Sequence, residues 1–103
     1  MSKRLAMLEK LTQDGSKDSF HWYALALEYA NAERVDDAVR TFESLRGIDA
    51  TYVPMYLMCG TTLTKANRKD EARTWLEAGV AAAQAKGDSH ALSEIQGALA
   101  ALG

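Results

Sequence analysis

The chain has 103 residues, of which 48% are apolar and 25% are charged, which is the composition of a globular domain with one core and not of a disordered or fibrous protein. Its formal net charge is −2 with both signs interspersed, which argues against a nucleic acid or a membrane surface as the main partner. A single cysteine cannot form an internal disulfide, in agreement with an expected location in the cytoplasm.

Six helices are predicted, with little room for strands. No apolar run of sufficient length follows Lys3 and Arg4, so neither a signal peptide nor a membrane span is expected. Helical spacing and capping residues place the helices at about 2–12, 18–31, 35–46, 52–66, 70–86 and 88–102. Gly47 and Gly87 are expected to end the third and fifth helices, and Pro54 is expected in the first turn of the fourth.

The sequence repeats itself with a fixed period, which equals the separation in sequence between Ala32 and Ala66. When the chain is shifted by this period, Ala32, Arg34, Asp36 and Ala38 fall on the identical residues Ala66, Arg68, Asp70 and Ala72. A fixed period of this size indicates stacked helical repeats. The repeat therefore has to be considered before any single residue is interpreted as a site.

The spacing of large and small residues within the period is that of a helical hairpin. The first copy carries Trp22, Leu25, Ala26, Tyr29, Ala38, Phe42 and Leu45, and the second carries Tyr56, Cys59, Gly60, Leu63, Ala72, Leu76 and Gly79. This pattern resembles the tetratricopeptide repeat, in which one unit has about 34 residues. The resemblance implies an all-α fold of antiparallel hairpins stacked as a short right-handed solenoid, with the large residues in the core and the small ones at close helix contacts.

The resemblance also divides the single domain into parts. Residues 1–17 are predicted to form an N-terminal capping helix, 18–51 the first repeat, 52–87 the second repeat and 88–103 a C-terminal capping helix. Leu8 lies one period before Phe42, so the first helix corresponds to the second half of a truncated repeat. The last helix follows the first half of a repeat with an offset that is longer by two positions, which places Ile95 on Cys59.

One side of each first helix is a candidate binding surface. By the resemblance, it would line the inner groove of the array and bind a protein or peptide partner. Its residues are Phe20, Tyr23, Leu27, Asn31, Leu57, Thr61 and Lys65. The apolar members would anchor a peptide, while Asn31 and Lys65 would fix its orientation. The alternative is that these residues pack against neighbouring helices. Some members of the family bind the C-terminal carboxylate of a partner with a lysine and an asparagine on the groove face. Tyr23 and Leu27 occupy those positions here, so this activity is not expected.

No motif for catalysis, for a cofactor or for a metal is present in the sequence, and we expect a non-enzymatic protein. His90 and Glu94 share one helix face, but two ligands are too few for a metal site. Cys59 is expected to point into the hairpin, where a thiol is inert. The one basic run contains Lys65, Arg68, Lys69 and Arg73, interrupted by Asp70 and Glu71, and is either a solvated turn or a site for an acidic partner.

Self-association is the alternative function. Trp75 lies one residue before the packed Leu76, which predicts an outward-facing tryptophan that could join Tyr52 and Met55 in an interface. The other interpretation of Trp75 is a ring lying flat over its own helix. A homo-oligomer could form through this face or through the apolar ends of the short array.

Overall fold

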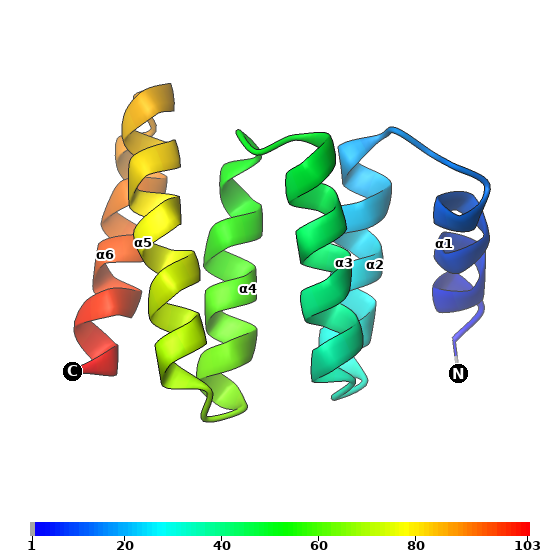
Figure 1. Cartoon of the computed structure of the whole chain (residues 1–103), viewed down its shortest axis with the longest axis horizontal. Helices are drawn as coiled ribbons and strands as arrows, with labels where there is room; N and C mark the ends of the chain where they lie inside the picture. The colour runs from blue at the N-terminus through cyan, green and yellow to red at the C-terminus, as the bar shows by residue number, and fades with distance from the viewer. Residues whose placement is uncertain (1) are drawn as a thin grey trace. The chain divides into compact units, whose positions relative to one another are not determined.

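The computed structural model describes residues 2–103, which contain six α-helices and no strand. The helices are α1 (Lys3–Gln13), α2 (Ser19–Asn31), α3 (Val35–Ile48), α4 (Val53–Lys65), α5 (Lys69–Lys86) and α6 (Ser89–Leu102) (Figure 1). They fall into two compact units, one ending at Asp49 with α1 to α3 and one beginning at Ala50 with α4 to α6. The all-α prediction is confirmed.

Short polar side chains begin three of the helices, as their positions in the sequence predicted. The Ser2 hydroxyl accepts a hydrogen bond from the Leu5 amide at 3.0 Å. The Asp18 carboxylate accepts one from the Phe20 amide, and the Asp88 carboxylate accepts one at 3.0 Å from the third amide of α6. Each bond satisfies an N–H group that has no partner inside the helix, which typically contributes about 1 kcal/mol.

The turns inside the two hairpins have the same geometry and lie one period apart. Glu33 and Asn67 both adopt a positive φ, 60° and 62°. The next amide in each case closes the preceding helix with a bond to the carbonyl five positions back, from Arg34 to Tyr29 and from Arg68 to Leu63, both 2.9 Å long. The period seen in the sequence is therefore also a period of backbone conformation.

The prediction that Gly47 ends the third helix is wrong. Helix α3 continues through Gly47 to Ile48, and Gly47 is absent from the residues with positive φ among those described. The Asp49 amide still bonds to the Leu45 carbonyl at 2.8 Å. A glycine costs a helix about 1 kcal/mol and ends it only where the backbone turns left-handed, as at Gly87 with φ 68°.

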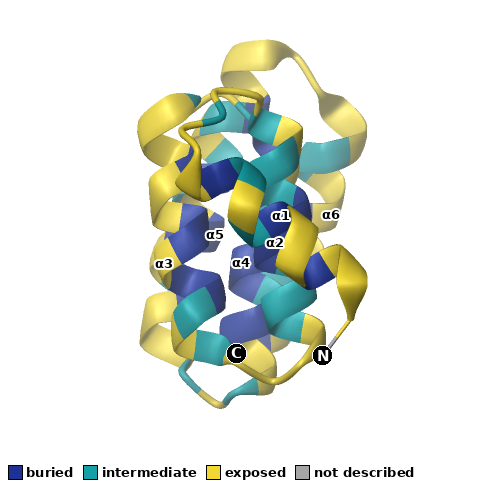
Figure 2. Cartoon of the chain, turned by 90° about the vertical axis from the view of Figure 1, so that its right-hand side faces the viewer, coloured by how far each residue is buried: buried dark blue, intermediate teal, exposed yellow. Residues whose placement is uncertain are grey.

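In the first unit, α2 packs against α1 and against α3. Leu5 and Leu8 of α1 form a cluster with Ala24 and Leu25 of α2. Along α2 and α3, fully buried residues recur with the helix period: Ala26, Ala38, Phe42 and Leu45. Figure 2 shows this alternation of buried and exposed positions along the helices. Trp22 is only half-buried, against the prediction of a core residue, and its indole N–H donates to the Ser16 carbonyl at 2.7 Å.

In the second unit, glycines set the distance between helices. A Cβ atom on Gly60 would lie 2.5 Å from the side chain of Leu76, so the α4 backbone at Gly60 packs directly against the Leu76 side chain of α5. A Cβ atom on Gly79 would lie 2.7 Å from the Cβ of Tyr56 and 3.2 Å from Ile95. Small residues at these positions permit the close approach that the sequence pattern predicted.

The predicted outward orientation of Trp75 is wrong. Its side chain is only 6% exposed, and its ring lies 6.1 Å from the ring of Tyr56 on α4, tilted by 48°. Tyr56 of α4 thus covers a residue one step from Leu76, which itself lies against Gly60 of α4. Trp75 is therefore a core residue, and the version of self-association that depended on it is excluded.

Candidate functional site

Helix α2 carries a face that its own unit does not cover. Phe20 is 56% exposed, the highest value among the large apolar residues of this helix. Tyr23 and Leu27 are half-buried and Asn31 is exposed. Steps of three and four residues place these positions on one side of the helix. That side differs from the sides used against α1 and α3, where Leu25 and Ala26 are buried.

Helix α4 presents the equivalent positions in the second unit. Leu57 and Thr61 are half-buried, and Lys65 is exposed at the end of the helix. The Thr61 hydroxyl donates to the Leu57 carbonyl at 2.8 Å, so its donor is already used within the helix. What Thr61 offers outward is therefore its methyl group, and the charge on this face comes from Lys65.

Asn31 also lines a recess in the first unit that the sequence did not predict. The recess has a volume of about 330 Å³ and is lined by Ser2, Leu5, Glu28, Asn31, Ala32 and Arg34. Glu28 is ion-paired with Arg4 at 3.1 Å. Because the recess is formed by the start of α1 and the end of α2, only the placement of the two helices reveals it.

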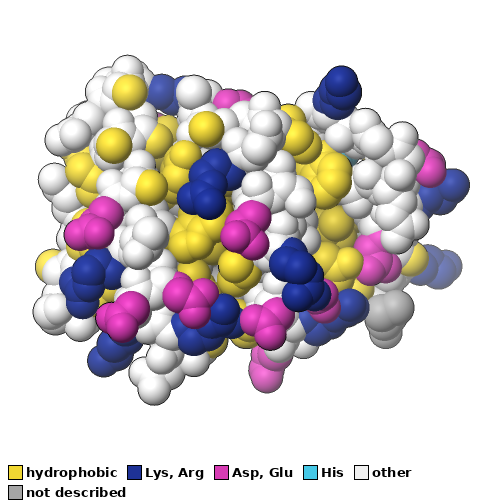
Figure 3. Space-filling model, in the orientation of Figure 1, with side chains coloured by type: hydrophobic (Ala, Val, Ile, Leu, Met, Phe, Trp, Pro, Cys, Tyr) yellow, Lys and Arg dark blue, Asp and Glu magenta, His cyan; other side chains and the backbone are white. Residues whose placement is uncertain are grey.

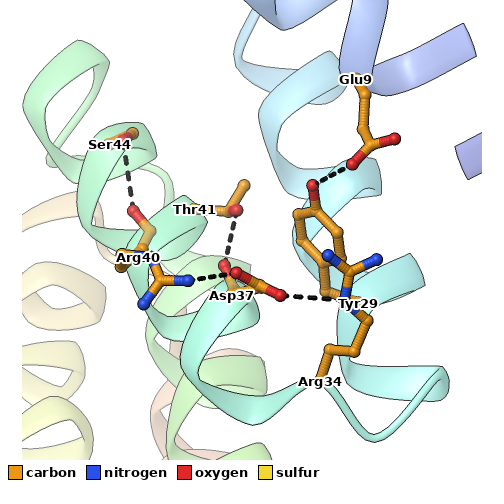
Figure 4. A network of polar contacts seen from close by, with 7 residues as sticks. All are labelled: Glu9, Tyr29, Arg34, Asp37, Arg40, Thr41 and Ser44. Carbon is orange, nitrogen blue, oxygen red and sulfur yellow. Dashed lines mark hydrogen bonds and ion pairs between the residues drawn. The ribbon is translucent and has the colours of Figure 1, made fainter. Parts of the chain in front are cut away.

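A network of polar contacts joins the three helices of the first unit near this recess (Figure 4). The Arg34 guanidinium lies 4.6 Å from the centre of the Tyr29 ring and bonds to Asp37 at 2.9 Å. Arg40 also bonds to Asp37. The hydrogen bond from Arg34 is the main reason that the pKa of Asp37 is lowered. The charges satisfy one another, so we assign the network to structure and not to ligand binding.

The Tyr29 hydroxyl donates to Glu9 at 2.5 Å, which joins α2 to α1. Burial, and then the Glu9 carboxylate, raises the pKa of Tyr29 from 10.0 to about 12. The proton is therefore held more tightly in the folded chain, so this contribution to stability is complete below pH 10 and is lost between pH 10 and 12.

We expect a spectrophotometric titration of tyrosine ionisation to show a step near pH 12 that Tyr29→Phe removes. Glu9→Gln should move this step downward but not to 10.0, because burial is the larger cause of the shift. If Tyr29→Phe instead removes a step near 10.0, neither the burial of the Tyr29 hydroxyl nor its bond to Glu9 persists in solution.

Two groups of polar residues resemble catalytic or metal sites without forming one. Ser16 Oγ lies 2.7 Å from His21 Nδ1, but His21 Nε2 is 3.7 Å from Asp18, whose carboxylate caps α2. The group therefore stabilises the turn before α2. His90 and Glu94 pair at 3.2 Å on the surface. Among residues 2–103, no three His, Cys, Asp or Glu side chains are grouped to hold a metal ion.

The two arginines of the basic run are bonded within the chain. Arg68 is ion-paired with Glu71 at 2.7 Å, and Arg73 donates to the Gly103 carbonyl at 3.3 Å. On the face of the molecule in Figure 3, basic and acidic side chains are interspersed. In the described part of the chain, no helix is long and apolar enough to cross a membrane.

A family model described as tetratricopeptide repeat matches residues 29–102. A protein from Bordetella parapertussis, solved in solution, is 29% identical with a TM-score of 0.84, over 99% of this chain and 89% of that one. A tetratricopeptide repeat domain protein from Salinibacter ruber is 32% identical, with a TM-score of 0.74 for its crystal structure (82% of this chain, 96% of that one). The solution structure of a domain protein of this kind from Salinibacter ruber, also 32% identical, gives 0.76 (82% and 86%). No curated protein matches the chain. The chain belongs to the tetratricopeptide repeat family.

Proposed function

We propose that this chain is a non-catalytic module that binds a peptide segment of a partner protein, with contacts from the Phe20 side of α2 and the Leu57 side of α4. Tetratricopeptide repeat domains in general bind protein partners and are not enzymes. The finer assignment, that Phe20, Tyr23, Leu27, Asn31, Leu57, Thr61 and Lys65 make the contact, is our proposal. A cytoplasmic location stays a prediction.

The observation that carries the proposal is that α2 has apolar residues on three sides, of which two pack against the other helices of its unit. One side packs on α1 and another on α3, through Leu25 and Ala26. The third side keeps Phe20, Tyr23 and Leu27 at least partly accessible. An apolar side that the core does not require is unfavourable to expose, and such surfaces are typical of protein interfaces.

The residue types indicate the kind of partner. Phe20 and Leu27 offer contact area to an apolar side chain, and a tyrosine such as Tyr23 combines an apolar ring with a polar end. Lys65 adds a positive charge at the end of the α4 side, which favours an acidic group on the peptide. A peptide with an apolar anchor and a carboxylate fits this chemistry.

The proposal is tested by comparative capture from extract of the native cells. We expect the wild-type chain to retain a set of proteins that the double variant Tyr23→Ala/Leu57→Ala loses, with helical content unchanged by circular dichroism. Removing two partly buried contact side chains from an interface commonly weakens binding by a factor of about ten or more. Titration calorimetry with the captured protein measures the loss.

Met7→Ala is the matched control, since Met7 is as exposed as Phe20, 56% in each case, and lies on α1 away from the proposed surface. It should retain the same proteins as the wild type. Equal capture by all three chains would show that the α2 and α4 sides do not bind the partner. A double variant that unfolds would instead place Tyr23 or Leu57 in the core.

A further inference from the structure

Helices α1 and α6 have the register of opposite halves of the repeat. Leu8 and Leu11 of α1 lie one period before Phe42 and Leu45, which belong to the second helix of a hairpin. Ile95 and Leu99 of α6 are equivalent to Cys59 and Leu63 at the longer offset of the last helix. Cys59 and Leu63 belong to the first helix of a hairpin. Within one chain, the described residues supply no partner helix to complete either half.

The apolar residues on these unmatched sides are incompletely buried. Leu45 and Leu63 are fully buried inside complete hairpins, whereas the equivalent Leu11 and Leu99 are only half-buried. Met7 is 56% exposed although Thr41, its equivalent one period later, is buried. The side that α6 leaves open is the one a second helix would cover, and α1 has the pattern of a second helix. A second copy of this chain therefore carries a helix with the required pattern.

Two long polar side chains stand at the point where such helices would cross. In the complete hairpins this point is occupied by Ala26 and Ala38, and by Gly60 and Ala72, all buried. Arg4 lies one period before Ala38, and Gln96 is the equivalent of Gly60 at the longer offset of α6. In the second hairpin, even a Cβ atom on Gly60 would lie 2.5 Å from Leu76. A glutamine or an arginine cannot enter a contact of that closeness.

Charge does not provide the barrier. Besides Arg4, α1 carries Lys3 and Lys10 against Glu9, and the one carboxylate of α6 is Glu94. The two helices therefore have opposite net charges even without Arg4. The Arg4 side chain, which is 58% exposed and ion-paired with Glu28, obstructs the contact by its size.

We propose that Arg4 and Gln96 determine the oligomeric state, by preventing α6 of one copy from pairing with α1 of a second copy into an intermolecular hairpin. The contact they prevent is heterologous, with α1 used in one copy and α6 in the other, so each copy could bind a further one. The inference rests on the repeat register and is independent of the proposed peptide binding.

The experiment compares the sedimentation of Arg4→Ala, Gln96→Ala, their equimolar mixture and the double variant. Alanine at both positions reproduces the Ala26 and Ala38 pair of the first hairpin and is favourable in a helix. We expect the wild type and each single variant to stay monomeric. The mixture should form a one-to-one dimer, because one variant has an α1 without the Arg4 side chain and the other has an α6 without the Gln96 side chain. The double variant should form longer assemblies that grow with concentration.

Two controls make the result specific. Lys10→Ala/Gln84→Ala removes one positive charge and one amide from exposed positions outside the two crossing points and should remain monomeric. Adding Met7→Glu to the double variant places a charge on the α1 side and should restore the monomer. A mixture that stays monomeric overturns the proposal, as does a wild type that associates as strongly as the double variant, or association that Met7→Glu leaves intact.

Discussion

Phe42→Ala is expected to destabilise the chain by about 3–5 kcal/mol, the usual cost of removing a buried aromatic ring and leaving a cavity. Phe42 is fully buried on α3, and it is among the largest side chains with no exposure. A domain of this size has a total free energy of unfolding of roughly 5–15 kcal/mol. Urea unfolding followed by circular dichroism should therefore show a large decrease in the midpoint, and a fraction of the chains should be unfolded without denaturant.

Phe20→Ala is the matched comparison, since the same atoms are removed from a side chain that is 56% exposed. We expect a change within about 0.5 kcal/mol, as is typical of surface substitutions. Because both variants replace phenylalanine by alanine, the difference between their losses of stability distinguishes a core position from a position on the candidate binding surface. Similar losses for both would mean that Phe20 is part of the core and would remove it from the proposed peptide contact.

The repeat and its turns could be predicted from sequence because they depend on local chemistry that recurs. Asn67 tolerates a left-handed backbone, and Arg34 and Arg68 close both turns in the same way one period apart. The period also separates the buried residues of the hairpins from the residues on the Phe20 side of α2. That separation requires only the helix period and two equivalent copies.

Contacts between helices account for two features that the sequence did not reveal. The outward orientation predicted for Trp75 from its place beside Leu76 assumes that α4 covers only one of the two residues, whereas Tyr56 of α4 also covers Trp75. The Tyr29 bond to Glu9 spans 20 residues and leaves no periodic signal. Gly47 has a different origin, because a propensity of about 1 kcal/mol does not end a helix where the backbone stays right-handed and the Asp49 amide still bonds to the Leu45 carbonyl.

Gly79→Ala is the second substitution for which we expect a large loss of stability. An added Cβ atom would lie 2.7 Å from the Cβ of Tyr56 and 3.2 Å from Ile95. The first of these atoms is attached to the α4 backbone, so it cannot move by rotation of a side chain. Either α4 and α5 must separate or Tyr56 must shift, and overpacking of this kind costs about 1–3 kcal/mol. Thermal unfolding measures the change.

Gly97→Ala provides the control with the opposite sign. Gly97 lies in α6 with no atom within 4 Å of an added Cβ, so alanine should only improve the helix, by up to about 1 kcal/mol. The same chemical change should thus lower the unfolding midpoint at Gly79 and raise it at Gly97. Equal signs at the two positions would contradict the close approach of α4 and α5 at Gly79. Because both variants gain the same helix propensity, the difference between them isolates the cost of moving these helices apart.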